Sequence, residues 1–414
     1  MGAVLICAAD PHANPIPAVD NYFPICGGGF QEFSIGPAGI ARAQLTWRTA
    51  GVFSVLSVQV NTADNGDLIY EVNIASADSA LTVNCTASTT GLFQDLSNTA
   101  SVSAGDLVCM HTSGTGGNAV RHSASVVFTA TTGHVIYHGT SLSSQSFNGT
   151  NTLYYKIAGN MGAEGAEANT QIRMDVAGTA AKLQCYVISN SKTLTVTFRT
   201  RVNAGDGGQT ITVLTTQTGL FEDTTGTDTL DGNDDINFAV TTLDTASFSF
   251  SFIACQFTSS ATNNQVMCAV AGGSAISNSL TRYEAIGGIY GNNATPDNAG
   301  TKLRHGFAVD VTRLSVYVSA FTLTTAASAT ITLFKNGVDG NNVLTVTGTG
   351  LTQDTTHTDS FTATDDINIE VDTTPATVGA FTARWLSVVE TLAAAAATGA
   401  IPYSRRARNY YLAR

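Results

Sequence analysis

Charge is scarce in this chain. Asp, Glu, Lys and Arg together make up 12% of its 414 residues, only 19 residues are Lys or Arg, and the formal net charge is −12. A body with so few basic residues and a mild negative charge is a poor partner for nucleic acid. Hydrophobic residues make up 43% of the chain, so it has enough apolar side chains to fill ordinary cores, and a globular rather than disordered protein is expected.

Long apolar runs are also lacking. No stretch approaches the roughly 18 consecutive apolar residues that a membrane helix needs, so no membrane partner is expected. The apolar N-terminal stretch 1–9 is short and has no basic residue before it, unlike a signal peptide. It also aligns with internal segments that begin at Val135 and Val266, and this alignment favours a first β-strand.

Paired cysteine motifs are absent. The seven cysteines, an odd number, are scattered without a CxxC pair or the spacing of zinc ligands. Cys185 stands where two related segments have Val58 and Val316, which predicts a small buried residue with a free thiol. Free thiols favour folding in a reducing compartment.

Catalytic signatures are absent as well. The chain has no Gly-x-Ser-x-Gly turn, no phosphate-binding Gly-rich loop before a helix, and no constellation of Cys and His. His134 and His138 have the i, i+4 spacing that joins zinc ligands on a helix, but their segment alternates like a strand. Glu164 and Glu167 have the residue type of a glycosidase pair, yet nothing places them across a cleft. We therefore predict no catalytic residue, no enzyme activity and no cofactor.

One motif occurs three times. A glycine is followed by an acidic residue four places later, an apolar residue eleven places later, Asp fifteen places later and Val or Ile seventeen places later. Such a shared register indicates an internal repeat. The glycine and the two acidic positions are Gly91, Asp95 and Asp106 in the first copy, Gly219, Asp223 and Asp234 in the second, and Gly350, Asp354 and Asp365 in the third.

The repeat extends over nearly the whole chain. Arg42, Arg173 and Arg304, for example, are 131 residues apart in each step. Three homologous domains of ordinary size are predicted, at 1–133, 134–264 and 265–392, followed by an Ala-rich and then basic tail at 393–414. The sequence leaves open whether the three domains form a pseudo-threefold body or a short rod.

Each repeat has the pattern of antiparallel strands. Apolar and polar residues alternate, which is typical of strands with one wet face. The clearest predicted hairpins lie just before the motif, with loops at 203–208 and 336–340 that contain the Asn, Asp and Gly of positive-φ turns. About six to eight strands per repeat predict an all-β protein made of three antiparallel β-sandwiches with a jelly-roll-like arrangement.

The acidic motif has two interpretations. In the first, the glycine starts a turn, and the acidic side chains accept hydrogen bonds from loop amides and cap the next strand. In the second, the crowded carboxylates of the middle copy hold calcium, which takes oxygen ligands. The first copy has Ala and Ser at two of these positions, so no metal requirement is predicted for the fold. The calcium candidates are Asp223, Asp228, Asp231 and Asp234.

The C-terminal tail differs in composition from the rest of the chain. It can be a frayed, solvated end. It can also be an arm that docks on an acidic neighbour, because Tyr and Arg are the residue types that anchor interfaces; nucleic acid is a lesser option for so short a basic run. The residues proposed for the arm are Arg405, Arg406, Arg408, Tyr410, Tyr411 and Arg414.

Tandem sandwiches rich in Thr, Ala and Gly, with the turn at 219–223 and an Asp-Ile or Asp-Val strand after it, resemble virion structural proteins of tailed bacteriophages. The resemblance is to capsid decoration proteins and to appendage or tail proteins. It implies a non-enzymatic component of the virion that is made in the host cytoplasm. The implied partners are other capsid or tail proteins and further copies of the chain itself.

A carbohydrate-binding adhesin or receptor-binding module is the alternative function. In that case exposed aromatic side chains form a platform for sugar rings, whereas alternation along the strands favours core packing for the two tryptophans. The aromatic residues considered are Trp47, Tyr283, Tyr290 and Trp385.

Overall fold

The structure is a computed structural model of the chain, and it describes most of the residues up to 392. The described ranges are 3–15, 20–26, 37–62, 65–115, 119–159, 162–261, 264–271, 276–284, 286, 288–290, 302–324 and 328–392. The tail at 393–414, which carries the proposed docking arm, lies outside them.

The described residues form an all-β protein, as predicted. Six sheets are built from antiparallel pairs, apart from one short parallel pairing between β20 (Asn264–Ala271) and β23 (Gly288–Tyr290). The helices in this part of the chain are α1 (Pro37–Ala43) and the 3₁₀ turn η1 (Glu167–Asn169). No helix among the described residues is long and apolar enough to cross a bilayer.

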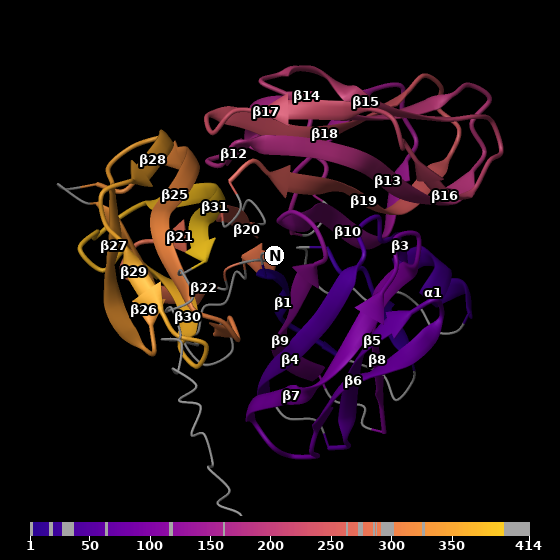
Figure 1. The fold of residues 1–414 in the computed structure, drawn as a ribbon. Coiled ribbons are helices and arrows are strands. Elements are labelled where there is room, and N and C mark those ends of the chain that lie inside the picture. The colour runs from indigo at the N-terminus through magenta and orange to yellow at the C-terminus, as the bar shows by residue number, and fades with distance from the viewer. Residues whose placement is uncertain are drawn as a thin grey trace, which may run out of the picture.

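The first unit, drawn in indigo to violet in Figure 1, consists of the strands from residue 3 to residue 130. Its two sheets have the orders β1-β9-β4-β7 and β2-β8-β5-β6, and β3 pairs with β8. The strands are β1 (Ala3–Pro15), β2 (Asn21–Phe23), β3 (Leu45–Thr46), β4 (Gly51–Thr62), β5 (Leu68–Ile74), β6 (Ala77–Cys85), β7 (Gly91–Val102), β8 (Leu107–Gly114) and β9 (Ala119–Ala130).

The second unit follows from residue 135 to residue 259. Its sheets have the orders β10-β19-β13-β16 and β11-β18-β14-β15, with the short strands β17 and β12 at their sides. The strands are β10 (Val135–Phe147), β11 (Thr152–Tyr155), β12 (Ile172–Met174), β13 (Gly178–Asn190), β14 (Val196–Val202), β15 (Gly205–Val213), β16 (Gly219–Glu222), β17 (Thr227–Leu230), β18 (Asp234–Thr242) and β19 (Phe248–Ser259).

The third unit runs from β20 to residue 392. Its sheets have the orders β23-β20-β31-β25-β28 and β22-β30-β26-β27, and β21, β24 and β29 are short side strands. The remaining strands are β21 (Ile276–Ser277), β22 (Thr281–Glu284), β24 (Leu303–Arg304), β25 (Val309–Phe321), β26 (Ala329–Lys335), β27 (Val338–Val346), β28 (Gly350–Asp354), β29 (Asp359–Phe361), β30 (Asp366–Asp372) and β31 (Ala380–Leu392).

All three units have the same connectivity. When the eight main strands of a unit are numbered in chain order, one sheet reads 1-8-3-6 and the other reads 2-7-4-5 in each case. A sandwich in which eight strands are divided between two sheets in this order is a jelly roll. The jelly-roll-like sandwich predicted from the alternating pattern is therefore the observed fold.

The hairpin between main strands 4 and 5 is tighter than predicted. Two residues with positive φ connect the strands in each unit, namely Ala75 and Ser76, Asn203 and Ala204, and Asn336 and Gly337. Two central residues with positive φ define a type I′ turn, whose twist matches that of the flanking strands. The predicted loops at 203–208 and 336–340 were therefore too long, because the Gly- and Asn-rich residues after the turn continue as strands.

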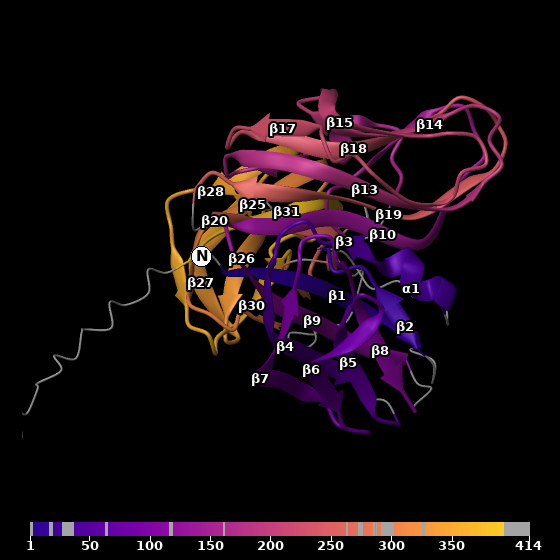
Figure 2. The ribbon, with the colours of Figure 1, turned by 45° about the vertical axis from the view of Figure 1, so that its right-hand side comes forward.

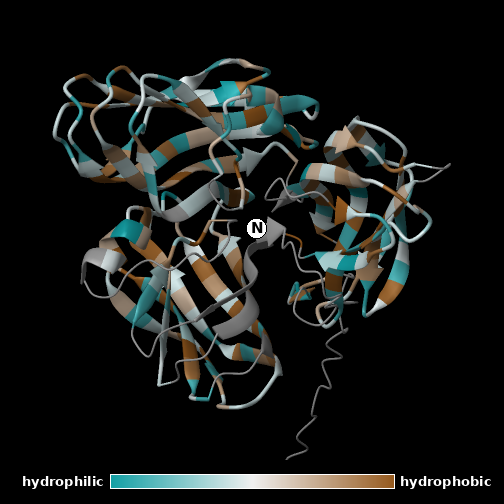
Figure 3. Cartoon of the chain, turned by 180° about the vertical axis from the view of Figure 1, so that it is seen from behind, coloured by the Kyte–Doolittle hydropathy of each residue, from teal (hydrophilic) through white to brown (hydrophobic). Residues whose placement is uncertain are grey.

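Each sandwich holds its core between its two sheets. Brown and teal residues alternate along the strands in Figure 3, as expected when one face of a sheet is buried. Cys185 is fully buried at the place of Val58 and Val316, which confirms its interpretation as a small buried residue, and its thiol is free. Burial also raises the pKa of this thiol well above its ordinary value.

The three units pack into a closed triangle rather than a rod (Figures 1 and 2). The first strands β1, β10 and β20 lie around the marked N-terminus at the centre. Each pair of units shares apolar contacts: Tyr137 packs into the core of the first unit, Trp385 into that of the second, and Val127 into that of the third.

One landmark of the repeat is misaligned. Arg173 and Arg304 occupy the same place, since each lies opposite an Asp in the neighbouring strand and forms an ion pair with it. In the first unit this place belongs to Thr46, which pairs with Leu107, whereas Arg42 lies in α1. The spacing of 131 residues therefore does not identify the equivalent residue in the first copy, where the helix shifts the register.

Candidate functional site

The repeated motif lies at the edge of each sandwich and joins its two sheets. Its glycine has a positive φ in all three copies, between 106° and 125°. The acidic residue four places later accepts a hydrogen bond from a backbone N–H of the opposite sheet and others from its own turn. The opposite-sheet donors are the N–H groups of Thr82, Thr210 and Val343, bound by Asp95, Asp223 and Asp354 at 3.1, 2.8 and 3.1 Å.

These hydrogen bonds control the acidity of the carboxyl groups. Partial burial alone would raise the pKa of Asp95, but donors from Asn98, Thr82 and Ser97 outweigh it and lower the pKa to about 2. Asp354 has the same balance, with a pKa of about 2, and the pKa of Asp223 is also lowered. Each carboxylate therefore stays charged and fixes its turn.

The Asp fifteen places after the glycine closes a second turn. It accepts a hydrogen bond from the N–H three residues earlier, and its own N–H donates to the carbonyl of that residue. The residues are Asp106 with Ser103, Asp234 with Asp231, and Asp365 with Thr362.

No three of the four calcium candidates of the middle copy bring their carboxylate oxygens within 4.8 Å of one another. Asp223 accepts from the backbone N–H groups of Thr225 and Gly226, and Asp234 accepts from the Asp231 N–H. Asp228 is buried and accepts from the Thr200 hydroxyl at 2.6 Å and from the Gln209 amide at 2.9 Å. Three of these carboxylates therefore accept hydrogen bonds from different groups of the protein.

The residues considered for catalysis are either buried or held in ion pairs. His134 and His138 are buried, and burial lowers the pKa of each imidazole to about 4. Glu164 pairs with Arg384 of the third unit at 2.8 Å, and Glu167 pairs with Arg201, also at 2.8 Å. Both carboxylates are thereby held by guanidinium groups.

The aromatic platform fails for both tryptophans. Trp47 is fully buried and stacks on Tyr137 of the second unit with ring centroids 4.2 Å apart, and Trp385 is 2% exposed. Tyr283 is partly buried against Phe334 at 5.3 Å. The side chain of Tyr290 lies outside the described residues. Neither tryptophan can therefore stack on a sugar ring.

The contacts between units use one equivalent position. Thr46, Arg173 and Arg304 are equivalent, because they pair with the same position of the neighbouring strand. The residues two places after them are therefore equivalent too, and these are Arg48, Asp175 and Gly306. Each of the three contacts the next unit in the triangle.

The first two of these contacts are charged. Arg48 Nε donates to Glu222 Oε1 of the second unit at 2.7 Å. Asp175 accepts from Arg313 and from the Gln353 amide of the third unit at 2.8 and 2.9 Å. Glu222 and Gln353 both stand three places after the motif glycine, so the motif also carries the contact between units.

The third contact is apolar and closes the triangle. A Cβ built on Gly306 would lie 2.4 Å from Cγ1 of Val55 in the first unit, so only glycine fits this approach. The Ser125 hydroxyl donates to the Arg304 carbonyl beside it at 3.3 Å. One position of each jelly roll therefore packs against a second, different surface of the next, and the pair of surfaces is the same at all three contacts.

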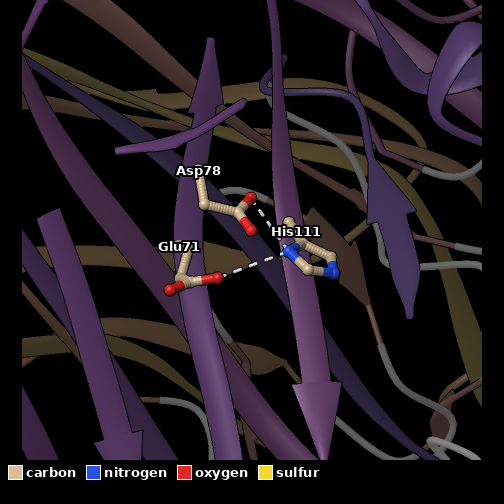
Figure 4. A group of neighbouring side chains, drawn as sticks. All are labelled: Glu71, Asp78 and His111. Carbon is tan, nitrogen blue, oxygen red and sulfur yellow. Dashed lines mark hydrogen bonds and ion pairs between the residues drawn. The ribbon is translucent and has the colours of Figure 1, made fainter. Parts of the chain in front are cut away.

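A cluster that the sequence analysis missed lies on the outer face of the first unit. Glu71 of β5, Asp78 of β6 and His111 of β8 point toward one another from three neighbouring strands (Figure 4). His111 Nδ1 is 3.0 Å from Asp78 Oδ1 and 3.3 Å from Glu71 Oε2. Within the described part of the chain, this is the group of three His, Cys, Asp or Glu side chains whose ligand atoms meet closely enough to hold a metal ion.

Carboxylates outnumber the imidazole in this cluster, since Asp20 lies near His111 in addition to Glu71 and Asp78. Burial raises the pKa of Glu71, and the adjacent Asp78 carboxylate raises it further. The pKa of Tyr22, whose ring stacks on His111, is also raised, first by burial and then by Asp20 and Asp78. The spacing of these residues along the chain gives no motif, since they meet only through the strand order 2-7-4-5.

Comparisons with known proteins give distant structural similarity only. No protein-family model and no curated protein matches the chain. A chain from "The Triple Jelly Roll Fold and Turret Assembly in an Archaeal Virus" is 13% identical, with 85% of this chain and 82% of that chain covered and a TM-score of 0.18. A chain from the Sulfolobus Turreted Icosahedral Virus structure is 12% identical, with 83% and 79% covered and a TM-score of 0.17. At these values the matches decide nothing, and the fold assignment rests on the strand order.

Proposed function

We propose that this chain is a non-enzymatic structural subunit of a virus particle and acts through contacts between subunits. The observation that carries the proposal is the closed triangle of three jelly rolls, in which an equivalent surface of each unit packs on the next. Jelly rolls recur in viral capsid domains, and they also occur in lectins. The burial of Trp47 and Trp385 takes both tryptophans out of the aromatic platform that the lectin alternative needs.

The polar groups of the body support a structural role. The repeated carboxylates hold turns, and Arg48, Asp175 and Glu164 join one unit to another. Side chains used in this way are committed to internal contacts. The triangle is therefore a building block joined by its own contacts, and it leaves the outer surfaces of the units for partners.

The second unit offers an apolar surface for such partners. Leu194, Leu214 and Leu243 are 48%, 53% and 57% exposed and flank the ends of β14, β15 and β18, which are paired there. Exposed leucines gathered on one end of a domain are typical of a contact surface. We assign this end of the second unit to contact with another virion protein.

The basic tail is the proposed clasp to a neighbouring subunit. Its arginines and tyrosines stand out in an acidic chain whose net charge, the tail included, is −12. Such a contact weakens with salt, because exposed charge pairs are screened over about 8–10 Å at physiological ionic strength. The location in the virion as a capsid decoration, appendage or tail component, and synthesis in the host cytoplasm, belong to this proposal; the free buried thiols are compatible with a reducing compartment.

The test is to purify particles on a density gradient from the culture that produces the chain and to count its copies by quantitative mass spectrometry. The proposal predicts a fixed copy number per particle and little binding to a glycan array. Absence from the particles, or tight glycan binding by the free protein, would contradict it.

Deletion of residues 403–414 tests the clasp separately. The clasp predicts a loss of incorporation into particles, with the melting temperature of the free protein unchanged. Undiminished incorporation would leave the sandwich surfaces as the interface.

A further inference from the structure

The same outer-face position is occupied differently in the three units. Asp78, Asp206 and Asp339 are the second residues of β6, β15 and β27, so all units keep a carboxylate there. Strand pairing places three further residues around each of these Asp residues. The first lies on main strand 4, two residues before the residue that pairs with the Asp. The second is that paired residue, and the third lies on main strand 7 opposite the first. These are Glu71, Asn73 and His111 in the first unit, Arg199, Arg201 and Ala239 in the second, and Thr332, Phe334 and Glu370 in the third.

The second unit neutralises its carboxylate with its own cations. Arg199 and Arg201 both form ion pairs with Asp206, one to each carboxylate oxygen. A guanidinium on each side compensates the charge of the Asp at this position.

The first unit has neither guanidinium at this position. Glu71 replaces one and Asn73 replaces the other, so a second carboxylate is added where a cation would be needed. His111, 6% exposed, is the third group of the cluster. Two carboxylates and an imidazole now converge where the sister unit has one carboxylate and two cations.

The distances in the first unit suit a metal ion. Tetrahedral ligands with bonds of about 2.0–2.1 Å stand about 3.3 Å from each other. The Nδ1 atom of His111 stands 3.0 and 3.3 Å from the nearest oxygens of Asp78 and Glu71. Two of the three distances between ligand atoms therefore match those around such an ion, and all three atoms lie within 4.8 Å of one another.

The surroundings of the cluster match a second ligand shell. His111 Nε2, on the far side of the ring, forms no hydrogen bond with the described residues, and Asp20 Oδ1 lies 3.5 Å from it. A metal-bound imidazole commonly donates this N–H to a carboxylate. Asn73 Nδ2 donates to Asp78 Oδ1 at 2.8 Å. The Tyr22 ring stacks on the imidazole with an interplanar angle of 13° and fixes its plane.

We propose that Glu71, Asp78 and His111 bind one divalent transition-metal ion of the Zn²⁺ class. One imidazole nitrogen and carboxylate oxygens are ligands for zinc, manganese or cobalt, whereas calcium takes six to eight oxygens. Three protein ligands leave one coordination position, and the Asp78 side chain, 39% exposed, opens it to solvent. The ion fastens the β5–β6 hairpin to β8 on the outer face of the first unit.

The experiment uses the full chain, stripped with a chelator and titrated with Zn²⁺ by calorimetry, with Co²⁺ as a spectroscopic probe. The proposal predicts one ion per chain at neutral pH, a higher melting temperature with the ion, and a Co²⁺ absorption band typical of nitrogen and oxygen ligands. Asp78→Asn and His111→Gln should each weaken binding by at least about 10-fold, since they remove direct ligands. Because the ligands must be deprotonated, binding should weaken in acid.

Asp339→Asn is the matched control, because it removes the equivalent carboxylate of the third unit, where no imidazole is present. It should leave the stoichiometry and affinity unchanged. No binding at one ion per chain, or equal affinity in wild type, Asp78→Asn and His111→Gln after circular dichroism shows that the variants are folded, would overturn the proposal. The cluster would then be an imidazole held between two carboxylates by hydrogen bonds alone. The outcome is independent of whether the chain is found in particles.

Discussion

Asp175 of the second unit and Arg313 of the third form an ion pair with 2.8 Å between Oδ1 and Nη1, and the Asp175 side chain is 1% exposed. The same carboxylate accepts from the Ser315 hydroxyl and the Gln353 amide. It is therefore the central acceptor of the contact between these two units.

Asp175→Ala should destabilise the chain by about 2–3 kcal/mol, because it leaves donors without an acceptor, one of them charged. The measurement is urea unfolding at neutral pH. Asp231→Asn, at an exposed turn residue, is the control and should change the free energy of unfolding by less than about 0.5 kcal/mol. Equal effects of the two substitutions would show that the contact between units contributes no stability.

Gly306→Ala tests the closure of the triangle. Gly306 has φ of +72°, and an added Cβ would meet Val55 Cγ1 at 2.4 Å, so we expect a loss of about 1–3 kcal/mol from strain and overpacking. Val55→Ala in the same chain should restore part of the loss. Gly348→Ala is the control, since an added Cβ there meets nothing within 4 Å. A neutral Gly306→Ala in thermal unfolding would mean that the first and third units do not pack as described.

The lowered pKa of Asp354 leads us to expect a loss of stability in acid. Its pKa is lowered to about 2 in the fold, because hydrogen bonds outweigh the opposing effect of burial, whereas an unfolded Asp titrates near 3.9. A lowered pKa contributes stability above pH 4 or so, and this contribution disappears as the pH falls toward 2. Asp354→Asn should therefore cost about 1–3 kcal/mol at pH 7 and almost nothing near pH 2 in urea unfolding. A cost that did not change with pH would contradict the assignment.

The lowered pKa of His138 leads us to expect a second pH dependence of stability, at higher pH than that of Asp354. Burial lowers its pKa to about 4, so the folded protein keeps it neutral while the unfolded chain binds a proton below about 6.5. Stability should therefore fall as the pH drops from 6.5 to 4, by up to about 3 kcal/mol from this residue. His138→Leu should flatten the slope of unfolding free energy against pH in this range. An unchanged slope would place the imidazole in water rather than in the core.

Much of the fold follows from the sequence because it depends on local pattern. The positive-φ glycine of the motif, the hairpin turn residues and the alternation along strands are all visible in single segments. The strand order is not, because main strands 1 and 8 of each unit pair across more than a hundred residues and alternation does not specify partners. Arg42 shows the same limit: one short helix moved the first copy out of register, and equal spacing then matched the wrong residue.

The candidate sites were harder to predict for a related reason. Arg48, Asp175 and Gly306 occupy one position but share no chemistry, so no alignment of residue types marks them as equivalent. Glu71, Asp78 and His111 become neighbours only after three strands pair. The signal that could have pointed to them is the Asp at the start of main strand 5 in every copy, together with the absence from the first copy of the two arginines that accompany it in the second.

The central claim is that the closed three-jelly-roll body is a subunit of a particle. Electron cryomicroscopy of the purified particles tests it most directly. The account predicts density in the shell or an appendage that fits all three units as one triangle, with the Arg48, Asp175 and Gly306 contacts inside it and subunit contacts on its outer surfaces. Particles whose full density is explained by other proteins, or units that separate and pack as a rod, would contradict it.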